Sequence, residues 1–362
     1  MPRAGFYPSA GRGGSAACSR ARPYASIVVG TVLRTWPPLA AAAVAALAGC
    51  GGCGGGGMGT DRGAGTPQVP TSQPWPKPEA RTLAQLRARL APGPRLATSV
   101  SVLEPGTDRI AFALFDRARR QIADTPTALY VARTDGTGLR GPFRARYTPL
   151  TVKPQFRSRT TSQDPDSANS IYVADAEFPA PGRYLVLGVA QLDQRLVGAA
   201  PVAVSVRRQW PPPAVGDLAP RVHTPTAASV AGDLASIDTR VPPDTMHSVD
   251  LARVLGRRPV MLLFATPGLC ASRICGPVTD IVEQLHAEER GEAEFIHMEI
   301  YNGNRRELGE RPQVRAYGLP SEPWLFGIDR HGRVAARIEG AFSLDEAKRA
   351  FDAALAGAPR RG

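Results

Sequence analysis

The sequence predicts two folded modules of different class, an all-β sandwich followed by an α/β domain, behind an N-terminal stretch without a core of its own. Three observations support this prediction. Residues 1–80 are rich in Gly and Pro, residues 96–206 hold short apolar runs of strand length, and residues 214–358 alternate strand and helix patterns. The predicted segments are a signal region (1–49), a tether (50–80), a short helix with the sandwich (81–207), a Pro-rich hinge (208–213) and the α/β domain (214–358).

The first segment has the order of an export signal. Arg34 precedes an apolar run of nine residues, Leu39 to Leu47, which is too short to span a bilayer as a permanent helix. The sequence "LAGC" then ends at Cys50 and resembles the lipobox of bacterial lipoproteins. This resemblance implies cleavage before Cys50, lipidation of its sulfur and anchoring to the outer face of a bacterial membrane. The alternative is an ordinary cleaved signal that leaves a secreted protein.

The tether and the charge pattern describe how the exported chain is presented. Residues 50–80 begin Gly-rich and end Pro-rich, so we expect a flexible, disordered spacer.

The formal net charge of +12 includes residues 1–49, which hold five arginines and no acidic residue. Beyond residue 49, 39 basic and 32 acidic residues remain, a difference of +7. These charges are mixed along the chain, which predicts a solvated surface and no nucleic-acid partner.

Residues 81–207 predict a short helix and then an antiparallel β-sandwich. The helix pattern is "EARTLAQLRARL", and it ends before Pro92 and Gly93. Seven runs rich in Val, Tyr and Phe follow, separated by Gly, Pro and Asp. They are "LATSVSVL", "IAFALF", "ALYVAR", "FRARY", "SIYVADAEF", "GRYLVLGV" and "PVAVSV". The segment "PAPGRYLVLG" resembles a late hairpin of immunoglobulin-like domains, and the absence of Cys and His from these runs indicates binding or spacing, not catalysis.

The last module alternates strands and helices. We expect a lead-in strand in "VGDLAPRVHTPT", a helix at "SVDLARVL", the strand "PVMLLF", a helix from Pro277 to about Glu289, the strand "EFIHMEIY", a short helix at "PQVRAYG", the strands "WLFGID" and "RVAARIEG", and a final helix. Ser343 and Glu346 predict a capping box for that final helix. Parallel strands joined by helices, followed by an antiparallel hairpin, predict a sheet that is covered on both faces.

Two cysteines five residues apart, Cys270 and Cys275, lie between the strand "PVMLLF" and the helix at Pro277. Within one helix they would point about 140° apart, so at least one of them lies outside it. With Cys270 in the loop and Cys275 at the helix start, the sulfurs can come within disulfide reach, and the positive end of the helix stabilises a thiolate. Outside the cytosol such a pair can be oxidised and persist. A structural disulfide or two inert buried thiols are the alternatives.

On these residues the C-terminal part resembles the thioredoxin-like superfamily, nearest to its exported, membrane-anchored thiol-disulfide oxidoreductases. The resemblance covers about 145 of 362 residues and rests on "VGDLAPRVHTPT", "PVMLLFATPGLC" and "LPSEPWLFGIDRHGRVAARIEG". It implies a thioredoxin-like fold and exchange with protein thiols or disulfides of the cell envelope, with no cofactor and no metal. It also implies that Cys270 and Cys275 are catalytic and that Pro323 is the family's cis-proline, which packs beside the dithiol.

The sequence departs from the family pattern in ways that bear on the mechanism. Four residues separate the cysteines where the family has two, and "CGPV" puts Val278 where the family's second cysteine stands. That match makes Cys275 the nucleophile, whereas "FATPGLC" resembles the approach to the family's first cysteine and favours Cys270; both assignments stay open. We expect Glu322 to oppose thiolate formation and Arg273 to favour it. Exchange further requires an exposed, ionised attacking thiol.

Other functions compete with disulfide exchange. In a binding or structural lipoprotein, the sandwich would recognise a partner and the cysteines would form an inert disulfide. A SCO-like copper chaperone would have a histidine shortly before the final hairpin, where this chain has Pro320 to Pro323. A peroxiredoxin would have its threonine three residues before the reactive cysteine, but Thr266 is four before Cys270, and Leu262 occupies the family's proline position. His297 is expected to be a core or edge residue of its strand.

Overall fold

The computed structural model describes residues 74–79 and 82–359, and this part of the chain is β-rich. The predicted signal region, Cys50 and most of the predicted tether lie outside the described residues. Among the residues that are described, none of the helices is both long and apolar enough to cross a membrane.

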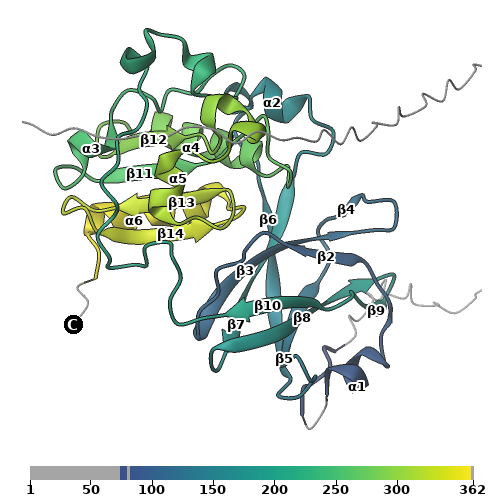
Figure 1. The fold of residues 1–362 in the computed structure, drawn as a ribbon. Coiled ribbons are helices and arrows are strands. Elements are labelled where there is room, and N and C mark those ends of the chain that lie inside the picture. The colour runs from purple at the N-terminus through teal and green to yellow at the C-terminus, as the bar shows by residue number, and fades with distance from the viewer. Residues whose placement is uncertain (1–73, 80–81, 360–362) are drawn as a thin grey trace, which may run out of the picture. The chain divides into compact units, whose positions relative to one another are not determined.

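The first module is a ten-stranded sheet that curls into a sandwich (Figure 1). Strand β6 (Arg140–Pro149) joins its two halves, because residues 140–145 pair with β5 (Thr127–Arg133) and residues 146–149 pair with β7 (Ser170–Phe178). The other strands are β1 (Ala91–Pro92), β2 (Arg95–Thr98), β3 (Gly106–Phe115), β4 (Gln121–Ile122), β8 (Gly182–Leu192), β9 (Arg195–Gly198) and β10 (Val202–Val206). Each of the seven predicted runs overlaps one of these strands.

Alternation along β5 explains why this module needs a helix outside its sheet. Leu129 and Val131 face the interior of the sandwich, whereas Ala128 and Tyr130 belong to a separate apolar cluster on the outer face. Helix α1 (Leu83–Arg87) covers that cluster with Leu83 and Leu86. The predicted short helix is thus present, and its apolar residues bury the outward side of a strand that is apolar on both faces.

The second module contains a four-stranded sheet in the order β12-β11-β13-β14. Strand β11 (Val260–Phe264) runs parallel to β12 (Glu294–Met298) and antiparallel to β13 (Trp324–Ile328), and β13 pairs antiparallel with β14 (Val334–Glu339). Its helices are α3 (Leu251–Val254), α4 (Cys275–Glu288), α5 (Pro312–Tyr317) and α6 (Leu344–Ala356). Ser343 and Glu346 form the predicted capping box of α6.

Helices cover both faces of this sheet, as the sequence predicts (Figure 1). In the central strand β11, Met261 and Leu263 belong to the cluster that includes α4 and α6. Val260, Leu262 and Phe264 belong to the cluster that includes α3 and α5. A strand buried on both faces reads as a continuous apolar run, which is the pattern of "VMLLF".

The predicted lead-in strand is wrong. The segment "VGDLAPRVHTPT" contains no strand, and Leu218 makes an isolated bridge with Arg333 beside the turn between β13 and β14. Pro220 and Pro225 supply no backbone N–H, so the segment lacks donors that a continuous ladder needs. The strand residues at this edge therefore pair with a short, irregular stretch.

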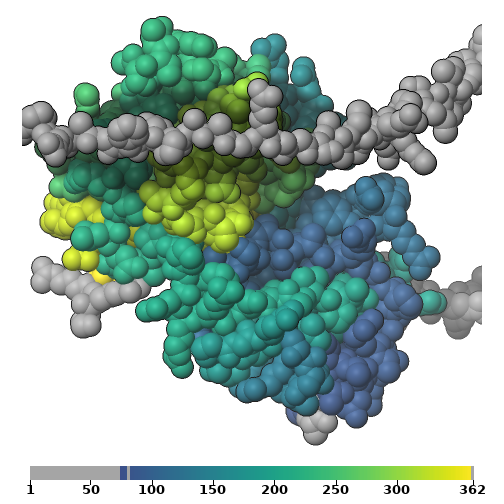
Figure 2. All heavy atoms as spheres, in the orientation of Figure 1, coloured from purple at the N-terminus to yellow at the C-terminus, as the bar shows by residue number. Residues whose placement is uncertain are grey.

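Hydrogen bonds join the sandwich to the α/β module, and Figure 2 shows the two as adjacent bodies. Arg109 of β3 forms an ion pair of 2.7 Å with Glu346 at the start of α6. The Glu339 carboxylate at the end of β14 accepts hydrogen bonds from Ser101 and from the backbone N–H of Val102. Both carboxylates are buried; Arg109 neutralises the charge of Glu346, and hydrogen bonds satisfy the oxygens of Glu339, so each carboxylate has partners in the sandwich module.

Candidate thiol site

The two cysteines occupy the positions that the sequence predicts relative to the helix. Cys270 lies in the loop after β11, and Cys275 is the first residue of α4. Both are thiols, and their sulfurs and a carboxylate oxygen of Glu322 all lie within 4.8 Å of one another. Pro323 follows Glu322 directly, and the peptide bond between them is cis.

Sheet register brings these residues together from distant parts of the sequence. Phe264, the last residue of β11, pairs with Trp324, the first residue of the antiparallel strand β13. The loop that leaves β11 and the Glu322–Pro323 segment that enters β13 therefore meet at one end of the sheet. Helix α4 starts at this same end, so its first backbone amides face the loop.

The surroundings of Cys270 favour its thiolate. A hydrogen bond from the Cys275 thiol is the largest cause, and it lowers the pKa of Cys270 to about 5 although burial acts in the opposite direction. Ser272 Oγ lies 3.2 Å from the sulfur, and the backbone amides of Cys275 and Ile274 also stabilise the negative charge. The N-terminal amides of α4 thus act on the loop cysteine and not on the sulfur of the helix residue that carries them.

Cys275 has the opposite tendency. Burial is the main reason that its pKa is raised well above the ordinary value, and the neighbouring Cys270 and Glu322 add to the rise. Its Sγ also lies 3.6 Å from Glu322 Oε2, so the single thiol proton has two acceptors within reach, Cys270 and Glu322. Burial, followed by repulsion from Cys270, raises the pKa of Glu322 to about 8. The site therefore holds one ionised thiol, one protonated thiol and a carboxyl group that titrates near neutral pH.

The loop between the cysteines is held by the sandwich module. Arg273 forms an ion pair with Asp164, 3.2 Å from nitrogen to oxygen, and its carbonyl accepts a hydrogen bond from the N–H of Ala168. The guanidinium is thus engaged by a carboxylate of the sandwich, and the main stabilisers of the Cys270 thiolate are hydrogen bonds and amides. Helix α2 (Arg159–Ser162) presses on the same region: a Cβ on Gly276 would stand 2.8 Å from Thr161 Oγ1.

The expectation that the pair lies open at the surface is wrong for both cysteines. Cys275 is fully enclosed and Cys270 is 4% exposed. Residues 158–168 of the sandwich module pack beside the cysteines, at Arg273 and Gly276, and no pattern within the α/β segment can predict this contact. Residues 271–273 of the loop are exposed, so a partner that reaches Cys270 must displace this short stretch.

A second group of titratable side chains was not predicted as a unit. Asp238, Asp244, His247 and His297 are all buried, and one ligand atom of each lies within 4.8 Å of the others. His297 is a core residue of β12, as expected, but its ring is hydrogen-bonded to Asp244 at 2.7 Å. The other three come from the irregular connection before α3, where no periodic pattern reveals burial. The sequence offered one signal for this group: two histidines and two aspartates, which are possible metal ligands, lie in a Pro-containing loop and in β12.

No family model and no curated protein matches the chain. Among solved structures, the chain is similar to the filamin domain of Lin-41, with 12% sequence identity and a TM-score of 0.18. The match covers 33% of this chain and 99% of that domain. A TM-score this low carries no argument about fold or function.

Proposed function

We propose that this protein is an exported, lipid-anchored thiol-disulfide oxidoreductase of the thioredoxin-like superfamily that exchanges disulfides through Cys270 and Cys275. One observation carries the proposal: two neighbouring thiols have opposite pKa shifts, with Cys270 near 5 and Cys275 well above its ordinary value. Two inert structural thiols do not need different pKa values. Disulfide exchange needs one ionised thiol that attacks and a second thiol that stays protonated until it resolves the mixed disulfide.

The arrangement of the α/β module supports the superfamily assignment. Its strands have the order β12-β11-β13-β14, its cysteine loop joins β11 to the start of α4, and a cis-proline precedes β13. The sandwich module, which we propose is immunoglobulin-like, serves as a binding or spacing element that also covers the cysteine loop.

In the first step of the proposed reaction, Cys270 is the attacking thiol. Its thiolate attacks one sulfur of a partner disulfide, a bond forms between the two sulfurs, and the partner's other sulfur leaves as a thiolate. The result is a mixed disulfide on Cys270. Of the two assignments that the sequence leaves open, this one is supported by the hydrogen bond from the Cys275 thiol and, to a smaller extent, by the amides at the start of α4, which stabilise charge on Cys270.

The second step releases the partner. Cys275 loses its proton to the Glu322 carboxylate, and its thiolate attacks the Cys270 sulfur, so that the intramolecular disulfide forms and the second partner sulfur leaves as a thiolate. Once Cys270 is bonded to the partner, it no longer carries the charge that raises the pKa of Glu322. More of Glu322 is then ionised when the proton must be accepted. The pair is oxidised and the partner disulfide is reduced; the reverse sequence oxidises a partner dithiol.

Trapping tests the proposal and the assignment together. With Cys275→Ser, partner proteins of the cell envelope should accumulate as mixed disulfides on Cys270, because the resolving thiol is missing. Cys270→Ser is the matched control and should trap little, since the remaining thiol is buried and protonated at neutral pH. If neither variant forms adducts, the exchange role is wrong. If Cys270→Ser alone traps partners, Cys275 is the nucleophile.

A structural role for the cysteines is the main competing function. It predicts a reduction potential below about −300 mV and slow exchange with small thiols, whereas exchange function predicts a higher potential and fast reaction of one thiol near neutral pH. A copper chaperone is separated by titrating the reduced protein with Cu(I). Tight stoichiometric binding that either cysteine variant abolishes would favour it.

The proposed location rests on residues outside the described part. Export and lipidation at Cys50 would place the exchange site where protein disulfides persist. Mass spectrometry of the membrane fraction tests this: we expect a lipid-modified N-terminal Cys50, and we expect Cys50→Ser to release the protein from the membrane.

A further inference from the structure

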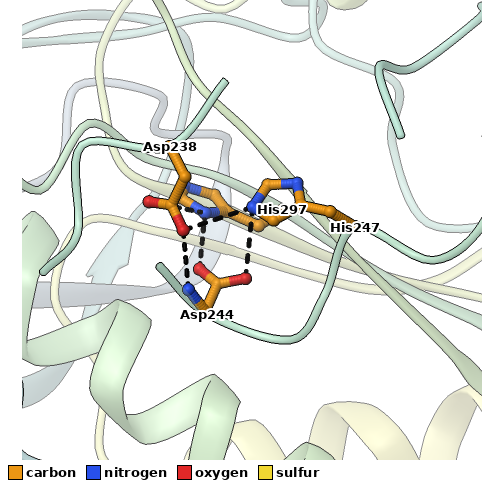
Figure 3. Close-up of side chains that lie close together, drawn as sticks. All are labelled: Asp238, Asp244, His247 and His297. Atoms are coloured by element: carbon orange, nitrogen blue, oxygen red, sulfur yellow. Dashed lines mark hydrogen bonds and ion pairs between the residues drawn. The ribbon is translucent and has the colours of Figure 1, made fainter. Parts of the chain in front are cut away.

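Four buried side chains that take no part in the proposed exchange reaction lie close together at β12 (Figure 3). His297 belongs to β12, and Asp238, Asp244 and His247 belong to the connection that precedes α3. His247 Nε2 lies 3.3 Å from Asp238 Oδ2 and 3.3 Å from Asp244 Oδ1. His297 Nδ1 lies 2.7 Å from Asp244 Oδ2 and 3.9 Å from Asp238 Oδ1. One nitrogen of each ring thus faces the same two carboxylates.

Outer hydrogen bonds fix the orientation of these groups. The Ala265 carbonyl lies 3.1 Å from His297 Nε2, and because a carbonyl can only accept, Nε2 carries a proton. Nδ1 donates to Asp244 without metal and would give up that proton to bind an ion with its lone pair. Backbone amides hold the carboxylates: Arg240 N–H donates to Asp238, and Met246 N–H donates to Asp244. Support of this kind keeps metal ligands aligned.

The spacing suits a tetrahedral ion. Around a tetrahedral Zn²⁺ with bonds of about 2.0–2.1 Å, ligand atoms lie about 3.3 Å apart, which matches both contacts of His247 Nε2. His297 Nδ1 contacts the other oxygen of each carboxylate, so both carboxylates must turn for one ion to bind all four side chains. The His297 separations of 2.7 Å from Asp244 and 3.9 Å from Asp238 must then each change by about 0.6 Å.

Charge balance also favours a divalent ion. Two carboxylates with less than 4% exposure are costly to bury unless their charge is neutralised. A divalent cation with two neutral imidazoles neutralises them completely. We infer that Asp238, Asp244, His247 and His297 bind a structural zinc ion that fastens the connection before α3 to β12.

The donor set narrows the choice of metal. Two imidazole nitrogens and two carboxylate oxygens suit Zn²⁺ and similar first-row ions, whereas Ca²⁺ and Mg²⁺ prefer oxygen alone and Cu(I) prefers sulfur. Four protein ligands in a closed, buried position are typical of structural and not catalytic zinc. The competing explanation is a cluster of hydrogen bonds and ion pairs that holds the same segments without metal.

The test measures metal in the full chain with Cys270→Ser and Cys275→Ser in place, so that the thiol pair binds none and the result is independent of the exchange function. After purification without chelators, elemental analysis should find about one more zinc per chain than in the same protein carrying His247→Gln or Asp244→Asn. His331→Gln, in the turn before β14, is the matched histidine control and should keep the zinc.

A second measurement covers variants that fold poorly. Protein stripped with a chelator and then given Co²⁺ should gain the visible absorption of a tetrahedral ion, and Zn²⁺ should raise its melting temperature while Mg²⁺ and Ca²⁺ do not. A zinc content that is zero, or equal in the parent and in both ligand variants, would overturn the inference. An unchanged melting temperature with Zn²⁺ would overturn it as well.

Discussion

The Cys275 thiol lies within hydrogen-bonding reach of the Glu322 carboxyl group, with 3.6 Å between Sγ and Oε2. This contact joins the start of α4 to the residue before the cis-proline. Glu322 was expected to oppose thiolate formation, and it does so for Cys275 while it is charged. Its second consequence is catalytic, because the same carboxylate is positioned to take the proton of that thiol.

We expect Glu322→Gln to slow the second chemical step without slowing the first. Loss of a positioned proton acceptor typically costs about 10²-fold or more in rate. The measurement is a single turnover with a small disulfide, quenched at intervals, in which mass spectrometry follows the mixed disulfide on Cys270. Glu310→Gln, an exposed carboxylate, is the control and should leave both steps unchanged.

The rate of the second step should depend on pH through the ionisation of Glu322. Burial and the Cys270 thiolate raise the pKa of Glu322 to about 8 in the reduced protein, and the mixed disulfide removes the thiolate charge. Resolution in the wild-type protein should therefore accelerate as pH rises and level off below about pH 8. In Glu322→Gln the acceleration should move to higher pH, where Cys275 itself ionises. Identical profiles for the two proteins would rule out Glu322 as the proton acceptor.

Alkylation should distinguish the two thiols by pH. The Cys270 pKa of about 5 means that its thiolate fraction, and hence its rate with iodoacetamide, should rise between about pH 4 and 6 and then level off. Cys275→Ala removes the strongest stabilising hydrogen bond, so the rise should shift to higher pH. Cys270→Ser should abolish the rapid reaction; rapid labelling of Cys275 at pH 6 would contradict the assignment.

The Arg273–Asp164 ion pair is expected to restrict access to Cys270. It ties the exposed loop to the sandwich, and its loss should let the loop open more often. Asp164→Ala should therefore raise the alkylation rate of Cys270 severalfold while leaving the pH of its rise unchanged. Asp166→Ala removes a carboxylate from the same segment and serves as the control. Equal rates in all three proteins would show that this ion pair does not limit access.

Much of the fold could be predicted because burial imposes a period on the sequence. The run "VMLLF" is buried on both faces of its sheet, and the capping residues Ser343 and Glu346 mark the start of α6 by local chemistry alone. The prediction of a lead-in strand was wrong because it followed the family resemblance. Pro220 and Pro225 remove backbone donors that a strand needs to pair.

The sequence predicted which residues form the thiol site, but it did not predict which of the two cysteines is ionised. The spacing and the predicted helix start near Pro277 placed Cys270 in the loop and Cys275 at the helix, yet the hydrogen bond from the Cys275 thiol, followed by smaller contributions from backbone amides, decides which sulfur is ionised. The cover over the loop comes from residues 158–168, which are more than a hundred positions away in sequence. Similarly, His247 and His297 are fifty residues apart, and a sequence has no local signal for that contact.

The buried ion pair between Arg240 and Asp280 gives a prediction about stability. Nitrogen and oxygen are 2.8 Å apart, and the two side chains are 5% and 1% exposed. Arg240 also donates to the Phe156 carbonyl, so it links α4 with the segment from the sandwich. Arg240→Ala leaves the Asp280 carboxylate buried without its cation, and removal of one partner from such a pair typically costs about 3–5 kcal/mol.

Denaturant unfolding at neutral pH measures this loss, and the exposed pair Arg146–Asp175 supplies the control. Its side chains are 60% and 50% exposed, so Arg146→Ala should lower the free energy of unfolding by no more than about 1 kcal/mol. Ser158 continues to donate to Asp280 in the Arg240 variant, but a hydroxyl cannot neutralise the charge. Equal losses for the two arginine variants would mean that Asp280 is hydrated or protonated and that the link between the modules contributes little stability.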